Sequence, residues 1–195
     1  MPRRSYDHYC AASRALDAVG DRWSLLVVRE LLSGPRRYSD LFADLPGIST
    51  DVLAARLKDL ERDGVLTRQR IGPRATSAYE LTAAGAGLRT VLDALSAWGT
   101  PALGDRRPTD AVRAHWLALP LGRAIGERID QGAVTVRIGE TVFHIVVDGG
   151  EVTHHDGPAA GPAVDLVLDL TTANAVASGA LALADAKPGW PRAAN

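Results

Sequence analysis

Two short helical segments on either side of a forced turn place the strongest constraint on this chain. Residues 39–44 are typical of a short helix that Ser39 can cap, and Leu45-Pro46-Gly47 then interrupts the helical pattern. Ser49 can cap a second helix, which Gly64 ends. Apolar residues recur along one side of that helix: Leu53, Leu57 and Leu60. Short helix, tight turn and second helix predict a helix-turn-helix.

The flanking segments predict a winged version of this motif. Residues 9–19 have the apolar periodicity of a helix, and Asp21 can cap the helix that follows. Short alternating runs at 65–70 and 77–81, on either side of a Gly-Pro turn, predict a β-hairpin or wing. Thr82 can cap a long amphipathic helix after the hairpin. We therefore predict that residues 1–100 form one winged helix-turn-helix domain.

Beyond residue 100 the sequence changes character. Residues 101–108 combine Pro, Gly and Arg without periodicity, which indicates a linker to a second domain at 109–195. Helical patterns at 109–119 and 121–130 precede strand patterns at 134–138, 141–147 and 164–170. Thr171 or Thr172 can cap one more helix, and we expect residues 180–195 to be loosely ordered. The predicted fold class is α+β, with a small second domain.

Composition limits the classes of protein that remain. The formal net charge of −1 argues, by itself, against a nucleic-acid partner, so only local clusters of arginine support one. The single cysteine, Cys10, excludes an internal disulfide and a multi-cysteine zinc site. No apolar run reaches the length of a membrane span, so we expect a soluble protein that is not exported and works in the cytoplasm.

Several linked motifs over residues 8–99 resemble the HxlR family of bacterial regulators. They include Gly20-Asp21-Arg22-Trp23, Arg29-Glu30-Leu31-Leu32-Ser33-Gly34-Pro35-Arg36-Arg37-Tyr38, Leu45-Pro46-Gly47-Ile48-Ser49 and Asp63-Gly64-Val65-Leu66. The resemblance implies a homodimeric winged-helix regulator, here expected to be a repressor that binds a pseudo-palindromic operator in double-stranded DNA.

The second domain resembles the sterol-carrier-protein-like fold through residues 134–150 and 164–178. That resemblance implies a cavity for a small apolar ligand, so the second domain is expected to sense an effector. The sequence departs from the fold after Leu183, where the closing segment of such a domain should continue.

The second helix of a helix-turn-helix lies in the major groove, with its N-terminal residues facing base edges. Ser49, Thr50 and Asp51 are therefore predicted to face base edges, with Thr50 and Asp51 reading bases, and Ala54 and Ala55 to meet thymine methyl groups. The alternative for Asp51 is that its carboxylate repels phosphates and only stabilises the first turn of the helix. Basic and polar side chains nearby are predicted to hold phosphates or to enter the minor groove. They are Arg36, Arg37, Tyr38, Arg56 and Lys58 for phosphates, and Arg68, Arg70 and Arg74 on the wing. The alternative for Arg56 is an ion pair with Asp59 or Glu61 on its own helix.

Cys10 has two interpretations. Some members of the family that the chain resembles sense oxidants or electrophiles through a cysteine near this position, and the alternative is a small residue packed in the first helix. The five histidines follow no metal or catalytic spacing, and His154 and His155 would lie on opposite faces of a strand. We therefore predict no catalytic residue, metal or cofactor. Two other functions remain open: an apolar-ligand carrier or small enzyme with an accessory winged helix, and a protein-interaction module that does not bind DNA.

Overall fold

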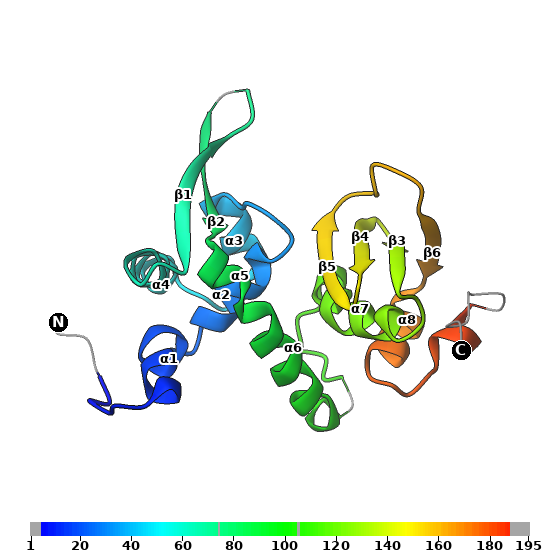
Figure 1. The fold of residues 1–195 in the computed structure, drawn as a ribbon, viewed down its shortest axis with the longest axis horizontal. Coiled ribbons are helices and arrows are strands. Elements are labelled where there is room, and N and C mark those ends of the chain that lie inside the picture. Colours follow the sequence, from blue (N-terminus) through cyan, green and yellow to red (C-terminus); the bar gives the residue numbers. More distant parts are fainter. Residues whose placement is uncertain (1–4, 74, 105, 188–195) are drawn as a thin grey trace. The chain divides into compact units, whose positions relative to one another are not determined.

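The computed structural model describes residues 5–73, 75–104 and 106–187. Its internal contacts divide the chain after Leu92 into two compact units, each with its own core and its own sheet (Figure 1). Among the described residues, no helix combines the length and the apolar character needed to cross a lipid bilayer.

The first unit is a cluster of helices from which a β-hairpin projects (Figure 1). Its elements, in chain order, are α1 (Ala11–Val19), α2 (Ser24–Leu31), α3 (Tyr38–Asp44), α4 (Thr50–Arg62), β1 (Leu66–Ile71), β2 (Thr76–Leu81), α5 (Ala83–Ala86) and the start of α6 (Leu88–Gly99). The order helix, helix-turn-helix, hairpin and helix is that of a winged helix, as the sequence predicts.

The core of the first unit forms around α2 and α4. Val27, Val28 and Leu31 of α2 are almost completely buried, and α2 contacts both α3 and α4. The predicted leucine stripe of α4 is buried against them, each side chain being at most 1% exposed. Burying a leucine side chain contributes about 2 kcal/mol. This stripe therefore fixes which face of α4 turns away from the protein.

Two capping predictions for the first unit are wrong, and a third holds for a shorter helix than predicted. Asp21 does not cap α2, which begins after Trp23 without any side-chain cap. Ser39 lies inside α3, because the Arg37 N–H donates to the Asp40 carboxylate and the helix begins at Tyr38. The Thr82 hydroxyl accepts from the Gly85 N–H, as predicted for a cap. The helix that it caps is only the short α5, because the helix is interrupted before α6 begins.

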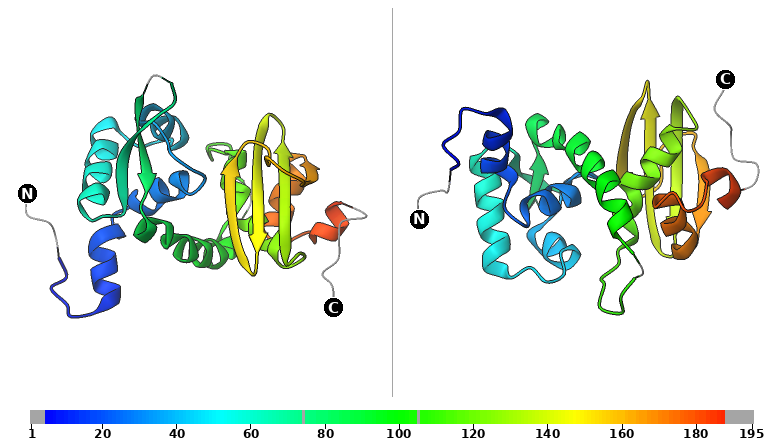
Figure 2. Two further views of the ribbon diagram at one scale, coloured as in Figure 1. Left: turned by 45° about the horizontal axis from the view of Figure 1, so that its top comes forward. Right: turned by 90° about the horizontal axis from the view of Figure 1, so that it is seen from below.

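The second unit is a four-stranded sheet with helices on one face. Its elements are the rest of α6, the 3₁₀ turns η1 (Thr100–Ala102) and η2 (Ala114–Leu117), α7 (Ala118–Gly126), β3 (Gln131–Ile138), β4 (Thr141–Asp148), β5 (Glu151–Asp156), β6 (Val164–Leu168), α8 (Leu170–Ala177) and α9 (Leu183–Ala186). The strand order is β5-β4-β3-β6, with β6 parallel to β3 and the other pairs antiparallel. Helix α7 packs on β4 and β5 and contacts α8 (Figure 2).

Close contact between α7 and β5 helps to form the core of the second unit. A Cβ atom on Gly122 or Gly126 would lie 3.0 Å or 2.8 Å from the methyl groups of Val152. These two glycines, one turn apart on α7, therefore let the helix approach the strand directly. Phe143, Ile145 and other buried side chains fill the helix–sheet layer.

Several details of the second unit differ from the prediction. Residues 109–113 are not helical, and the first helical turn is the 3₁₀ segment Ala114–Leu117. Strand β5 was not predicted, because its run of polar residues and adjacent histidines lacks an alternating apolar pattern. Asp169, rather than a threonine, caps α8 by accepting from the Thr172 N–H at 2.8 Å. Of the segment predicted to be loose, residues 183–186 form α9, and residues 188–195 lie outside the described residues.

Candidate nucleic-acid interface

Helix α4, the second helix of the helix-turn-helix, buries one face and exposes the other. The Ser49 hydroxyl accepts from the Val52 N–H at 3.3 Å, so the predicted cap is present. Opposite the buried leucines, at positions that share one side of a helix, lie exposed residues. They are Thr50, Asp51, Ala54, Ala55 and Lys58. The residues predicted to meet bases therefore share one open surface, which we call the α4 face.

Tyr38 joins the two helices of the motif. Its hydroxyl donates to the Thr50 carbonyl oxygen at 2.9 Å, across 12 residues of chain. The bond links the first turn of α3 to the first turn of α4, where the α4 face begins. Tyr38 was predicted to contact phosphate, and that contact stays a prediction. What the sequence did not reveal is that the hydroxyl already holds the N-terminus of α4.

Arg36 and Arg37 are neighbours with different surroundings. The Arg36 guanidinium, which is partly buried, donates to the Ser33 hydroxyl at 2.9 Å. The Arg36 backbone exchanges hydrogen bonds with Tyr79 on β2, which ties the start of the motif to the wing. The side chain of Arg37 is exposed. Of the two residues, Arg37 is thus more accessible to an external phosphate.

Arg56 takes part in a network of acidic side chains. Its guanidinium forms ion pairs with Asp21, from the turn between α1 and α2, and with Asp59 at 2.9 Å, one turn along α4. Only 20% of the Arg56 side chain is exposed. The pair with Asp59 is the alternative considered from the sequence, whereas the partner 35 residues earlier in the chain was not foreseen. Arg56 links α4 to the preceding helices.

The wing carries two described arginines. Arg68 on β1 lies 3.3 Å from the Glu61 carboxylate, and its guanidinium lies over the Tyr79 ring at 5.3 Å from the centroid. Arg70 donates to the Ala75 carbonyl at 3.0 Å, close to the hairpin turn. Both side chains remain exposed. Arg74 lies outside the described residues.

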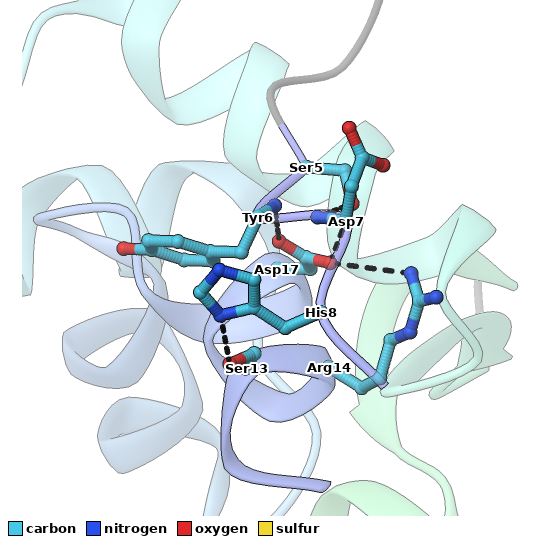
Figure 3. A network of polar contacts seen from close by, with 7 residues as sticks. All are labelled: Ser5, Tyr6, Asp7, His8, Ser13, Arg14 and Asp17. Atoms are coloured by element: carbon cyan, nitrogen blue, oxygen red, sulfur yellow. Dashed lines mark hydrogen bonds and ion pairs between the residues drawn. The ribbon is translucent and has the colours of Figure 1, made fainter. Parts of the chain in front are cut away.

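Cys10 lies at the N-cap position of α1 and is exposed. Hydrogen bonds from the Ser13 backbone, the Ser13 hydroxyl and the Ala12 backbone lower the pKa of the Cys10 thiol below its ordinary value. His8 lies close by, with its Nδ1 atom 3.2 Å from the Ser13 hydroxyl (Figure 3). The exposure is at odds with the interpretation of Cys10 as a packed residue.

The chain before Cys10 is anchored on α1. The Asp17 carboxylate accepts from the Ser5 hydroxyl at 2.9 Å and from the Tyr6 N–H at 3.0 Å, and it lies 3.7 Å from the Arg14 guanidinium (Figure 3). These contacts give the segment around Cys10 a defined course along the helix.

Helix α6 has large apolar side chains that are exposed to solvent. Val91, Leu95 and Trp98 follow each other at spacings of four and three residues, so they lie on one side of the helix. Trp98 is 81% exposed. Such a stripe is typical of a surface that is covered by another protein chain.

The capped α4 with its open face, and the hairpin beside it, define a protein of the winged helix-turn-helix class. A family model described as HxlR-like helix-turn-helix matches residues 18–106. The HTH-type transcriptional regulator sll1512 of Synechocystis sp. is 40% identical over 96 residues, covering 48% of this chain and 70% of that protein. The chain belongs to the HxlR family of helix-turn-helix transcriptional regulators, and the predicted family is confirmed.

Two further similarities concern YodB of Bacillus subtilis, which is also named an HTH-type transcriptional regulator. The sequences are 34% identical over 85 residues, covering 43% of this chain and 76% of YodB. The solved structure of reduced YodB matches at a TM-score of 0.43 and 30% identity, covering 53% of this chain and all of that chain.

Proposed function

We propose that this regulator binds double-stranded operator DNA as a homodimer and represses transcription. The α4 face enters the major groove of each half of a pseudo-palindromic site, with Thr50 and Asp51 at base edges. The supporting observation is the division of α4 into a buried leucine face and an open face that begins at the capped N-terminus. This role places the protein with chromosomal DNA in the cytoplasm.

The basic residues divide between contact with DNA and support of the fold. Lys58, on the α4 face, and Arg37, at the start of α3, are proposed to hold phosphates because both side chains are exposed. The wing residues Arg68 and Arg70, together with Arg74, are proposed to reach the adjacent minor groove. Arg56 is proposed to act indirectly, by keeping α4 in place through its two carboxylate partners.

The apolar stripe of α6 supports the homodimer. Three exposed apolar side chains on one helix face are costly in water, and a second copy of the helix would cover them. Trp98, the most exposed of the three, is available for packing against the partner helix.

Cys10 is proposed to sense oxidants or electrophiles. Its exposure and lowered pKa favour the thiolate, which is the reactive form. Because the chain has only this cysteine, the oxidised product would be a disulfide between subunits or with a small thiol.

The second unit is proposed to respond to an apolar effector, as its resemblance to sterol-carrier-like domains implies. The contact of Gly122 and Gly126 with Val152 leaves no room for a ligand between α7 and β5. An apolar ligand would therefore have to enter the helix–sheet layer elsewhere, by displacing side chains that now fill it. Thermal unfolding with and without a long-chain fatty acid tests this role, and an unchanged midpoint at saturating ligand would contradict it.

The regulator proposal is tested by fluorescence anisotropy of the full-length protein on its own upstream DNA and on random duplex, across a salt series. We expect a preference for upstream DNA and an affinity that falls steeply with salt. Lys58→Ala should lower the salt slope by about 0.9 per lost phosphate contact, hence by about 1.8 for a dimer with two copies of Lys58.

Arg62→Ala is the matched control on the same helix. Arg62 is exposed but lies at the C-terminal end of α4, where it pairs with Asp59 at 2.9 Å, so its loss should leave the slope unchanged. Equal slopes for wild type and Lys58→Ala would contradict the proposed α4 face. Absence of any DNA binding, combined with uptake of an apolar ligand, would instead favour a carrier with an accessory winged helix.

A further inference from the structure

Two histidines lie side by side on the second unit's sheet. His144 on β4 and His155 on β5 are directly opposite in the antiparallel register. Their ring centroids are 5.2 Å apart, and the ring planes differ by 29°. In the sequence, His155 adjoins only His154, and its proximity to His144 depends on the register of β5.

The pair lies on the face of the sheet that points away from α7 and α8. Phe143 and Ile145, on either side of His144 in β4, are buried in the core that these helices cover. Since successive side chains of a strand point to opposite faces, His144 and His155 point to the other face. His144 is half-buried there and His155 is exposed.

The His144 ring is fixed by the chain that follows β5. Its Nδ1 atom lies 3.0 Å from the Gly157 carbonyl oxygen, which can only accept a hydrogen bond. Nδ1 therefore carries the proton in the neutral ring, and Nε2 carries the lone pair. The Gly157 N–H in turn donates to the Val142 carbonyl at 3.0 Å, so the carbonyl that orients the ring is itself held. Metal-binding histidines are commonly oriented by such a carbonyl on the other ring nitrogen.

The same row of the sheet continues with oxygen-bearing side chains. Thr135 on β3 is paired with His144, and Asp165 on β6 is paired with Thr135. The Thr135 hydroxyl accepts from the Ala159 N–H at 3.2 Å, which fixes the segment above the row. The Asp165 carboxylate lies 3.9 Å from the Arg137 guanidinium, so its charge is already compensated within the sheet and the two imidazoles are the ligands that the row offers.

We propose that His144 and His155 bind a divalent transition-metal ion such as Zn²⁺, Cu²⁺ or Ni²⁺, with water in the remaining positions. Imidazole nitrogen is a preferred ligand for these ions. Two nitrogens on one tetrahedral zinc lie about 3.3 Å apart, given Zn–N distances of about 2.0–2.1 Å. With the His144 ring held by Gly157, rotation of the exposed His155 ring about χ2, a soft torsion for histidine, is what brings one of its nitrogens toward Nε2 of His144.

The test uses the full-length protein with Cys10→Ser, so that the thiol does not bind metal. Imidazole ¹H–¹⁵N spectra resolve the five histidines during addition of substoichiometric Cu²⁺, a paramagnetic ion. We expect the signals of His144 and His155 to disappear first, together, while that of His8 persists. Earlier loss of any other histidine signal would overturn the proposal.

Calorimetric titration with Zn²⁺ gives the second readout. His155→Ala should weaken binding about tenfold or more, and so should His144→Ala, whereas His8→Ala, an exposed histidine elsewhere, should bind as the parent does. Because His155 is exposed, its variant should keep the parent's circular dichroism spectrum, which separates a lost ligand from a lost fold. No binding by the parent, or equal affinity in His155→Ala, would refute the site.

Discussion

Gly85→Ala should disrupt the close contact between α5, the short helix after the wing, and the backbone just before β1. A Cβ atom at Gly85 would lie 1.9 Å from the Val65 carbonyl oxygen, which is backbone. Restoring a tolerable separation of about 3.0 Å requires a shift of about 1.1 Å, the difference between the two distances. The Val65 carbonyl cannot move freely, because it accepts from the Thr82 N–H at 3.0 Å, and Thr82 caps the same short helix.

Three contributions set the expected loss of stability. Overpacking at a buried position costs about 1–3 kcal/mol. Weakening one backbone hydrogen bond adds about 1 kcal/mol. Alanine in place of glycine in a helix returns about 1 kcal/mol. The net expectation for Gly85→Ala is a loss of about 2 kcal/mol in the free energy of unfolding of the first unit.

Urea unfolding followed by circular dichroism measures this loss, with Gly87→Ala as the control. A Cβ atom at Gly87 would lie 3.3 Å from its nearest neighbour, the Ala84 carbonyl, and Gly87 already has a right-handed helical conformation. Gly87→Ala should therefore be neutral or slightly stabilising. Equal stability of the two variants would refute the argument that the glycine at position 85 is required by close contact.

Three further predictions concern the interface. Tyr38→Phe removes the hydroxyl that holds the first turn of α4, and should cost about 1 kcal/mol of stability while lowering affinity for operator more than for random duplex. Arg56→Ala should cost at most about 1 kcal/mol in urea unfolding, since the pairs are partly exposed, and should leave the salt slope of DNA binding unchanged. Ser13→Ala keeps the Ser13 backbone N–H, which is the largest cause of the lowered pKa of Cys10, and removes the hydroxyl. The pKa of Cys10 should therefore rise only in part, so that the pH at which iodoacetamide alkylation reaches half its maximal rate moves upward; an unchanged pH profile would rule out the Ser13 hydroxyl as a contributor.

Local signals were enough to predict α4. The Ser49 cap, the leucine stripe and the glycine that follows the helix all act within one or two turns, and the structure has each of them. Asp21 shows the limit of such signals. It has the residue type and position of a cap, yet its carboxylate binds Arg56, which lies 35 residues later and is brought near only by the packing of α4. A carboxylate at a capping position can accept from the helix N–H groups or form an ion pair with a residue distant in the sequence. The sequence alone does not show which of the two interactions forms.

The register of the strands could not be predicted from the sequence either. Strand β5 has polar residues at most positions, because it lies at an edge of the sheet with one face uncovered, so no apolar alternation marks it. Without β5, His155 has no cross-strand neighbour, and histidines 11 residues apart in the sequence give no metal-binding spacing. The pair with His144 exists only once the hairpin register is known.

The arginines of the first unit show why the net charge of the chain does not indicate whether it binds DNA. The net charge of −1 reflects nearly equal numbers of basic and acidic residues. Some of the acidic residues neutralise arginines that fasten elements together, as Asp21 and Asp59 do for Arg56. Lys58, among the described residues, has no such carboxylate partner, and it lies on the α4 face. Charge that is paired within the fold contributes little to phosphate binding, whereas an unpaired charge contributes fully through counterion release. The relevant quantity for DNA binding is therefore the unpaired basic charge on one face, which the net charge of the chain does not measure.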